Sequence, residues 1–343
     1  MVETYKVDLR PTVLLIDGAH ALRRSMYAGN LRELSNSQGM PTGAVYGFLN
    51  ILRSAVTSMS ANSVCVCWEG GHSERRVQVY GDYKKKDYGE EAERDIHGMT
   101  DYEYYCHQLS WIQKILELLG VHQLKVEGKE GDDVLYQAAH LINGRKVIVS
   151  EDRDFYALVN EDISIYRPIK KEFITYDNFK ELSEGYASPT HYLYGKVLLG
   201  DGSDNIPSVA KGCGEKTILS VLDRIEEPSE LSPEKILKEA ASIGNARAMK
   251  LVEAGIEPIR RNLDLVDISR EKFDIFQLKS LSDELESMRY PNVAMANKLF
   301  GVLEFSESNT RSIVSRLSTM SEFPLNTLIN RDYIKNVMIG GIQ

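Results

Sequence analysis

Acidic side chains stand where three short apolar runs of this sequence end. Residues 13–16 form a continuous apolar run, and residues 63–68 and 146–149 are largely apolar, a pattern typical of buried strands in a parallel sheet. Because the carboxyl ends of parallel strands meet at one edge of a sheet, the acids that follow them are expected to lie together. These acids are Asp17, Glu69 and Asp152.

Further acids occupy the loops and helix starts that come after. Close carboxylates repel one another, and burying them without a counter-charge is unfavourable. Divalent cations remove that penalty, and hard oxygen ligands favour Mg²⁺ or Mn²⁺. Two such ions can generate hydroxide and stabilise both the attacking and the leaving oxygen, so the pattern predicts metal-dependent phosphodiester hydrolysis. The additional acids are Glu130, Asp132, Asp133, Asp154, Asp201 and Asp204.

Each acid taken singly also has an ordinary explanation. An Asp followed by Gly at the end of a strand, such as Asp17, is common turn chemistry. Asp132 or Asp133 could cap a helix and interact with its dipole. Asp201 and Asp204 could be plain loop residues. The joint placement of so many acids at predicted strand ends argues against coincidence.

The segments that must position these acids alternate between strands and helices. This alternation predicts an α/β fold with a mostly parallel central sheet flanked by helices. Residues 70–100 interrupt it, because they are polar and lack periodicity, which indicates a mobile excursion. Helices are expected at 42–59 (begun by Thr42), 101–119 (ended by Gly120) and 132–142, and further strands at 122–126, 163–166 and 172–176.

After about residue 186 the sequence becomes helical. A helix is expected over 189–199, followed by a turn-rich stretch at 200–205. A glycine-rich stretch at 211–217 leads into another helix that runs to Leu222. Residues 233–254 and roughly 278–318 also look helical.

The bulk composition restricts the class of protein. The net charge of −9 is a weak argument against nucleic-acid binding, because local distribution matters more than the total. No apolar run is long enough to cross a bilayer, and residues 1–11 lack the apolar core of a signal peptide. The four scattered cysteines fit a reducing, intracellular setting. Basic residues gather at 23–24, 75–76, 84–86 and at Lys211 with Lys216, either as solvated surface charges or as phosphate contacts.

Several short motifs occur in a fixed order along the chain. They are Ile16-Asp17-Gly18, Trp68-Glu69-Gly70 followed by Arg75-Arg76, Tyr83-Lys84, Glu130-Gly131-Asp132-Asp133, Ser150-Glu151-Asp152-Arg153-Asp154, Gly200-Asp201-Gly202-Ser203-Asp204-Asn205-Ile206-Pro207 and Gly212-Cys213-Gly214-Glu215-Lys216-Thr217. With them, residues 12–265 resemble the flap endonuclease and 5′-3′ exonuclease family, particularly its stand-alone bacteriophage type, which includes phage ribonuclease H. The loop motif at 200–207 is the most specific match.

The resemblance implies a division of the chain into three parts. Residues 1–186 would form a PIN-like nuclease core, with an arch segment at about 70–105 over the site. Residues 187–265 would form a helix–three-turn–helix region that binds DNA. Residues 266–343 match no motif and are expected to form a helical region of unknown role, which could brace the core or bind a replication partner.

The resemblance also implies roles for individual residues. One Mg²⁺ ion, which Mn²⁺ could replace, would be held by Asp17, Glu69, Glu130 and Asp132. A second ion would be held by Asp152, Asp154 and Asp204, with Asp201 nearby and Asp133 in either shell. Lys84 and Arg24 would face the scissile phosphate and offset its developing charge.

Contacts to DNA are implied at the arch and at the glycine-rich stretch. Backbone groups and a K⁺ ion would hold duplex phosphates at the latter, where a helix start lies beside two lysines. A Walker A loop would require Gly-Lys-Thr, but Glu215 separates Gly214 from Lys216; a plain tight turn stays open. The DNA-binding residues would be Arg75, Arg76, Tyr83, Lys85, Lys211, Gly212, Gly214, Lys216 and Thr217.

Two positions depart from the family pattern. Glu69 stands where Asp is usual, so its longer side chain makes an indirect metal contact conceivable. Gly131 replaces the usual alanine at a helix start. The arch has mixed charge, with Lys85, Lys86 and Arg94 beside acids, and disorder without DNA is expected. The acids in the arch are Glu90, Glu91, Glu93 and Asp95.

The resemblance implies a structure-specific 5′-nuclease that acts at 5′ flaps, nicks or RNA primer ends during DNA replication. DNA and RNA–DNA hybrids would be its substrates, and a clamp or single-strand binding protein a partner. A monomer in the cytoplasm of a bacterium or a phage-infected cell is expected. Two alternatives stay open, namely a PIN-type nuclease for single-stranded RNA and a DNA-binding protein without activity.

Overall fold

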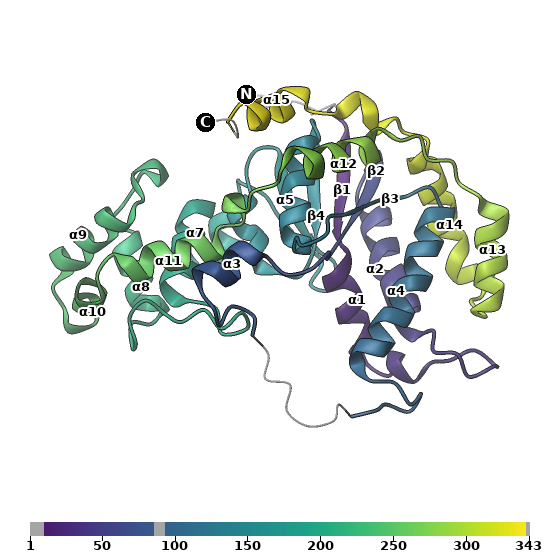
Figure 1. The fold of residues 1–343 in the computed structure, drawn as a ribbon, viewed down its shortest axis with the longest axis horizontal. Coiled ribbons are helices and arrows are strands. Elements are labelled where there is room, and N and C mark those ends of the chain that lie inside the picture. Colours follow the sequence, from purple (N-terminus) through teal and green to yellow (C-terminus); the bar gives the residue numbers. More distant parts are fainter. Residues whose placement is uncertain (1–9, 86–92, 341–343) are drawn as a thin grey trace, which may run out of the picture.

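The computed structural model describes residues 10–85 and 93–340 and is built around a six-stranded sheet (Figure 1). The strands lie in the order β3-β2-β1-β4-β5-β6. Neighbours from β3 to β5 run parallel, and only β6 pairs antiparallel at its edge. The strands are β1 (Thr12–Asp17), β2 (Ser63–Trp68), β3 (His122–Lys125), β4 (Arg145–Val149), β5 (Ile163–Arg167) and β6 (Glu172–Ile174).

The central strands are the most apolar because helices cover both of their faces. Every residue of β2 is buried, and β1 is buried from its second residue onward. Asp17, the last residue of β1, pairs with Cys67 of β2, and Ile16 pairs with Val149 of β4. The carboxyl ends of these three strands are therefore level with one another, as the sequence predicted.

Two hydrophobic cores lie on opposite faces of the sheet. Leu14 and Ile16 of β1 point into one, while Val13 and Leu15 point into the other, as strand alternation requires. The first core is closed by α1 (Gly18–Met26), α2 (Gly43–Ser58), α4 (Asp101–Leu118), α13 (Val293–Val302) and α14 (Glu307–Ser321). The second is closed by α5 (Gly131–Leu141), α12 (Ile275–Glu286) and the helices that follow the sheet.

A helical module extends from one side of the sheet (Figure 1, left). It continues the second hydrophobic core without a break. Its first helix, α7, starts at Pro189 behind the capping residue Ser188, as the sequence predicted. The module comprises α7 (Pro189–Leu199), α8 (Glu215–Leu222), α9 (Pro233–Ile243), α10 (Ala246–Ala254) and α11 (Glu257–Val266).

Some elements differ from the expectation. The stretch 233–254, predicted to be helical, forms the two helices α9 and α10, because Gly244 adopts a left-handed conformation (φ 66°) and Asn245 caps a new helix. The stretch 278–318, also predicted to be helical, forms most of α12 together with α13 and α14. Thr42 precedes α2 but makes no capping hydrogen bond with its side chain. The helices α1, α11 and α15 (Arg331–Gly340) were not predicted; each has only nine or ten residues.

The arch segment is only partly described. Its first leg contains a short helix, α3 (Glu74–Val79), where no periodicity predicted one. Its second leg joins α4, where Thr100 and Glu103 form a capping box. Lys86, Glu90 and Glu91 lie outside the described residues. Across residues 10–85 and 93–340, none of the helices has the length and apolar character needed to cross a membrane.

The C-terminal region packs on the core. Leu317 of α14 is fully buried in the first core, against α2 and β2. At the other face, the Tyr333 hydroxyl donates to Gln137 of α5 at 2.7 Å. The bracing role predicted for residues 266–343 is therefore supported by these contacts.

Replacement of Leu317 tests this brace. Leu317→Ala is expected to lower the free energy of unfolding by about 2–5 kcal/mol, because it leaves a cavity in a packed core. Arg316→Ala, an exposed neighbour on the same helix, should change it by less than about 0.5 kcal/mol. Urea unfolding followed by circular dichroism measures both values. Equal midpoints for the two variants would contradict the bracing role.

Candidate active site

Asp17 is the centre of the acidic edge. It ends β1 and caps α1, so the chain direction and the first helix both fix its side chain. Its Oδ1 accepts a hydrogen bond from the His20 backbone N–H at 3.0 Å, and its Oδ2 accepts one from the Ser150 hydroxyl at 2.9 Å. Burial, with a contribution from Asp152, raises the pKa of Asp17.

Asp152, Asp154 and Asp132 surround Asp17. Asp152 follows β4 and caps a 3₁₀ helix (Arg153–Leu158) by accepting from the Asp154 N–H at 2.9 Å. Asp132 lies in the first turn of α5. Burial, followed by the charges of Asp17 and Asp152, raises the pKa of Asp132 well above its ordinary value. Burial and the neighbouring Asp152 raise the pKa of Asp154 to about 7. These carboxylates therefore lie in a common negative electrostatic field that nearby cations neutralise only in part.

Glu130 is the best compensated acid of the group. One of its oxygens accepts from the Ser73 N–H at 3.2 Å, and the other accepts from the Tyr83 hydroxyl at 2.9 Å and the Lys84 Nζ at 2.7 Å. Burial would raise its pKa, but Lys84 and Arg76 outweigh burial and lower it. Lys84 Nζ also lies 3.7 Å from Asp204. Lys84 thus stands between two of the predicted metal ligands.

Lys196 is a site residue that the sequence reasoning missed. It lies on α7, and its Nζ contacts Asp154 and also Asp201, the latter at 2.9 Å. Burial would raise the pKa of Asp201, but Lys196 and the Ser203 hydroxyl lower it to about 2. A lysine within the otherwise apolar segment 192–199 was the available signal, since such a residue requires a carboxylate partner.

The loop of residues 200–206 docks on the start of the arch. Asn205 adopts a left-handed conformation (φ 60°), and its side-chain amide donates to the carbonyls of Asp82 and Lys85 at 3.0 and 2.7 Å. The Lys84 N–H donates to the Asp204 carbonyl at 3.0 Å. A hollow forms between these segments. Beside Arg76, Tyr83 and several apolar side chains, it is lined by five acids and one lysine, namely Lys84, Glu130, Asp132, Asp154, Asp201 and Asp204.

Glu69 points away from this hollow. Its carboxylate accepts from Arg23 Nη2 at 2.5 Å, and the Arg23 guanidinium also lies over the ring of Tyr105. Glu69, which stands where the family usually has Asp, is therefore paired with an arginine in the structure. Arg24, the next residue on α1, is exposed and lines a separate hollow with Ser150 and Glu151.

Asp133 is held by an arginine rather than offered to a metal. The Arg76 guanidinium donates to both of its oxygens, at 2.7 and 2.8 Å. Asp133 is fully buried and Arg76 is 3% exposed. Burial would lower the pKa of Arg76, but the pairing with Asp133 raises it. We therefore revise both assignments, because this buried pair leaves neither side chain free for metal or DNA.

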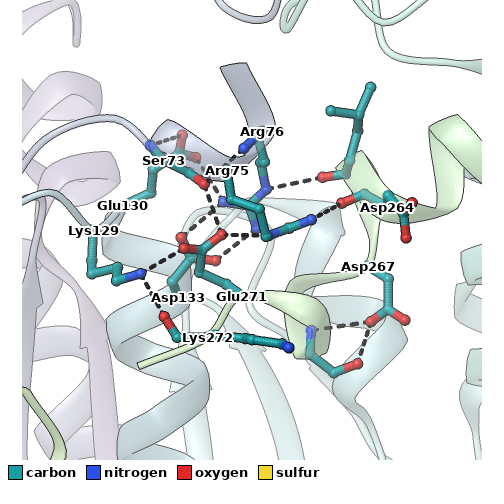
Figure 2. A network of polar contacts seen from close by, with 12 residues as sticks. Ser73, Arg75, Arg76, Lys129, Glu130, Asp133, Asp264, Asp267, Glu271 and Lys272 are labelled. Atoms are coloured by element: carbon teal, nitrogen blue, oxygen red, sulfur yellow. Dashed lines mark hydrogen bonds and ion pairs between the residues drawn. The ribbon is translucent and has the colours of Figure 1, made fainter. Parts of the chain in front are cut away.

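The side chains of Arg75 and Tyr83 also contact acids and carbonyls of the protein itself, and Figure 2 shows those of Arg75. Arg75 donates to Glu271 and to the Asp264 carbonyl, and Tyr83 is buried with its hydroxyl on Glu130. Their predicted DNA contacts are revised on the same ground. Lys85, by contrast, is 71% exposed and near only Asp82, at 3.4 Å.

The glycine-rich stretch presents an exposed surface. Gly214 precedes α8 and leaves the first turn of that helix open, and Gly212 has a φ of 83° that favours glycine. Thr217 is buried beneath them. The exposed residues of the stretch are Lys211, Gly212, Gly214, Glu215 and Lys216.

The donor set fits divalent metal ions, although the acids are not drawn into a closed shell. In the part of the chain that the structure describes, no three His, Cys, Asp or Glu side chains converge closely enough to hold an ion as they stand. Lys84 and Lys196 occupy the space between them instead. The raised pKa values of Asp17, Asp132 and Asp154 indicate that cationic compensation is incomplete, and carboxylate oxygens suit hard cations.

An acidic strand edge with inserted lysines, beside an exposed basic turn, defines the class of a metal-dependent nuclease. Comparison with known proteins identifies the family. A family model described as "5′-3′ exonuclease, N-terminal resolvase-like domain" matches residues 12–184. The chain is 30% identical over 288 residues to the 5′-3′ exonuclease of Aquifex aeolicus, covering 80% of this chain and 92% of that protein. The chain belongs to the 5′-3′ exonuclease family, and the resemblance seen in the sequence is confirmed.

A longer protein also matches. The thermostable DNA polymerase I of Thermus filiformis is 32% identical over 284 residues, which cover 81% of this chain but only 31% of the polymerase. The matched region is thus less than a third of that relative. What the rest of the polymerase does is not transferred to this chain.

Solved structures show the same fold. A complex of the bacteriophage T5 D15 flap endonuclease with DNA and metal ions has a TM-score of 0.58 at 17% identity, covering 89% of this chain and 99% of that one. Flap endonuclease-1 from Methanococcus jannaschii has a TM-score of 0.54 at 15% identity, covering 90% and 92%. The predicted PIN-like α/β fold is confirmed.

The revised role of Arg76 is testable by stability. Arg76→Ala is expected to lower the free energy of unfolding by about 3–5 kcal/mol, because it leaves the Asp133 carboxylate buried and unpaired. Arg24→Ala removes an exposed arginine and should change that free energy by less than about 0.5 kcal/mol. Urea unfolding compares them. If Arg76→Ala is as stable as Arg24→Ala, the pairing of Arg76 with Asp133 does not stabilise the fold, and the revision of the predicted DNA contact fails.

Proposed function

We propose that this nuclease hydrolyses phosphodiesters at 5′ flaps, nicks and RNA primer ends during DNA replication. The observation that carries the proposal is the group of Asp17, Asp132, Asp152 and Asp154 at the carboxyl edge of the sheet, where burial and the neighbouring acids raise the pKa of Asp17, Asp132 and Asp154. A site of this charge attracts cations and requires them before a phosphate can approach.

Two Mg²⁺ ions, or Mn²⁺ in their place, would occupy this edge. Asp17, Glu130 and Asp132 would hold the first ion, with Glu69 reaching it through water because Arg23 holds its carboxylate. Asp152, Asp154 and Asp204 would hold the second, with Asp201 behind them. Ions bound there would supply Lewis-acid chemistry that activates water and offsets negative charge on the attacking and leaving oxygens.

The chain's own residues would orient the acids and neutralise charge on the substrate phosphate. The Ser150 hydroxyl and the His20 backbone N–H each hold one oxygen of Asp17 and fix the orientation of that carboxylate. Lys84 Nζ is placed to move from Glu130 toward a phosphate oxygen and offset its growing charge. Arg24 is exposed on the adjacent helix and offers a second cation to the substrate strand.

Duplex binding is proposed for the exposed glycine-rich stretch. The open start of α8 and the exposed Lys211 and Lys216 suit backbone phosphates, and a K⁺ ion could share these contacts. Lys85 would contact the 5′ strand. DNA and RNA–DNA hybrids are the proposed substrates, a clamp or single-strand binding protein a proposed partner, and a cytoplasmic monomer the proposed form.

The metal requirement tests the site. Cleavage of a labelled 5′ flap in Mg²⁺ is expected to stop with chelator and to fall at least about a hundredfold in the Asp152→Asn, Asp154→Asn double variant. Asp177→Asn, an exposed acid outside the site, should keep the wild-type rate. Product lengths are read on a denaturing gel. Equal cleavage in all reactions would exclude the two-metal site, and a preference for unstructured RNA would favour a single-strand ribonuclease.

Two adjacent lysines should separate chemistry from binding. Lys84→Ala is expected to lower kcat by about 10²–10³-fold, because it removes a cation aimed at the reacting phosphate. Lys85→Ala should instead raise the Kd for DNA and reduce its salt dependence by about one phosphate contact. Steady-state cleavage and fluorescence anisotropy at several salt concentrations measure these effects. The assignment fails if Lys85→Ala lowers kcat as much as Lys84→Ala does.

A further inference from the structure

Glu271 is a buried carboxylate in the region that matches no family motif. It follows α11 and the 3₁₀ helix Ile268–Arg270 and is only 4% exposed. Its Oε2 accepts from the Ser73 hydroxyl at 2.7 Å and from Arg75 Nε at 3.0 Å. Its Oε1 accepts from Lys129 Nζ at 2.6 Å. Figure 2 shows these donors converging on it from different elements.

The donors come from the two segments that carry Lys84 and Glu130. Ser73 caps α3, the helix at the start of the arch, by accepting from the Arg76 N–H at 3.1 Å. Lys129 directly precedes Glu130, and its carbonyl accepts from the Gly70 N–H at 2.9 Å. One carboxylate therefore ties the start of the arch to the start of α5.

Glu130 depends on this junction at both of its oxygens. Ser73, which directly precedes α3, donates from its backbone N–H to Oε1. Tyr83 and Lys84, which follow α3 in the chain, donate to Oε2. A shift of α3 would therefore rotate the Glu130 carboxylate and move Lys84 with it. Glu271 itself touches neither residue.

The same junction reaches the helical module. Arg75 Nη1 donates to the Asp264 carbonyl at 2.8 Å, and Arg76 Nε donates to the Leu265 carbonyl at 3.0 Å. Both carbonyls belong to the last turns of α11. Since α3 is held between α5, α11 and Glu271, its position is over-determined, and it links the proposed duplex-binding module to the reacting end.

We propose that Glu271 is a positioning residue for cleavage. It clamps Ser73 and Lys129 together, fixes α3, and through α3 sets the geometry of Glu130 and Lys84. This role rests on the proposed function of the site. It gives the C-terminal region a part in the reaction in addition to bracing the core.

Glu271→Gln is the direct test, because the amide keeps the shape but carries no charge for Lys129 and Arg75. Glu284→Gln is the matched control, since Glu284, on α12, is a half-buried acid of the C-terminal region that pairs with Arg289. Arg75→Gln, at the more accessible end of the clamp, is a milder second variant. Each protein is compared by thermal unfolding, by anisotropy with flap DNA in chelator, and by single-turnover cleavage.

The expected result is a fall of about tenfold or more in the single-turnover rate of Glu271→Gln, as for supporting residues around metal sites. Its Kd for DNA should stay within about twofold, because Glu271 lies beneath the surface and contacts no phosphate. Arg75→Gln should slow cleavage in the same direction. Glu284→Gln should keep the wild-type rate even where its melting temperature falls.

Three results would overturn the proposal. One is a wild-type rate in folded Glu271→Gln. Another is equal slowing in Glu284→Gln, which would reduce the effect to stability. The third, should Glu271→Gln not fold, is a wild-type rate in Arg75→Gln. If the wild-type protein itself leaves the flap uncut, the proposed function fails. If the wild-type protein cuts the flap and only the variants behave against expectation, the positioning role of Glu271 fails alone.

Discussion

Repulsion among acids at the carboxyl edge of the sheet is the constraint on which the rest of the structure depends. Asp17, Asp132 and Asp152 are fixed there by strand ends and helix starts, so they cannot separate to relieve it. Compensation must come from cations on other elements, which is why Lys84 and Lys196 reach in from the arch and from α7. The docking of those elements is therefore part of the active site.

The basic residues divide into two groups with different physical roles. Arg23, Arg75 and Arg76 pair with Glu69, Glu271 and Asp133, and the bidentate pair of Arg76 with Asp133 is buried. Lys85, Lys211 and Lys216 stay exposed. A net charge of −9 is thus compatible with DNA binding, because the local distribution of exposed lysines matters more than the total charge.

The C-terminal region is integral to the nuclease core. Its helices fill the first core with residues such as Leu317 and Phe300, and its first loop supplies Glu271 to the junction behind Glu130. A segment without any recognisable motif can contribute in this way, because packing and buried ion pairs require complementarity with a partner and not a fixed local pattern.

The sequence by itself determined the strands, their mostly parallel direction and the edge at which the acids meet, because apolar runs and strand-end acids are local patterns. It also indicated the family. Only the tertiary structure decided which charges pair: Arg76 with Asp133, Arg23 with Glu69, and Lys196 with Asp154 and Asp201. These partners lie 42 to 57 residues apart, except Asp201, and local periodicity carries no information on such distances. For the same reason, the sequence did not predict the helix α3 or the role of Glu271, because contacts with residues distant in the chain set their positions.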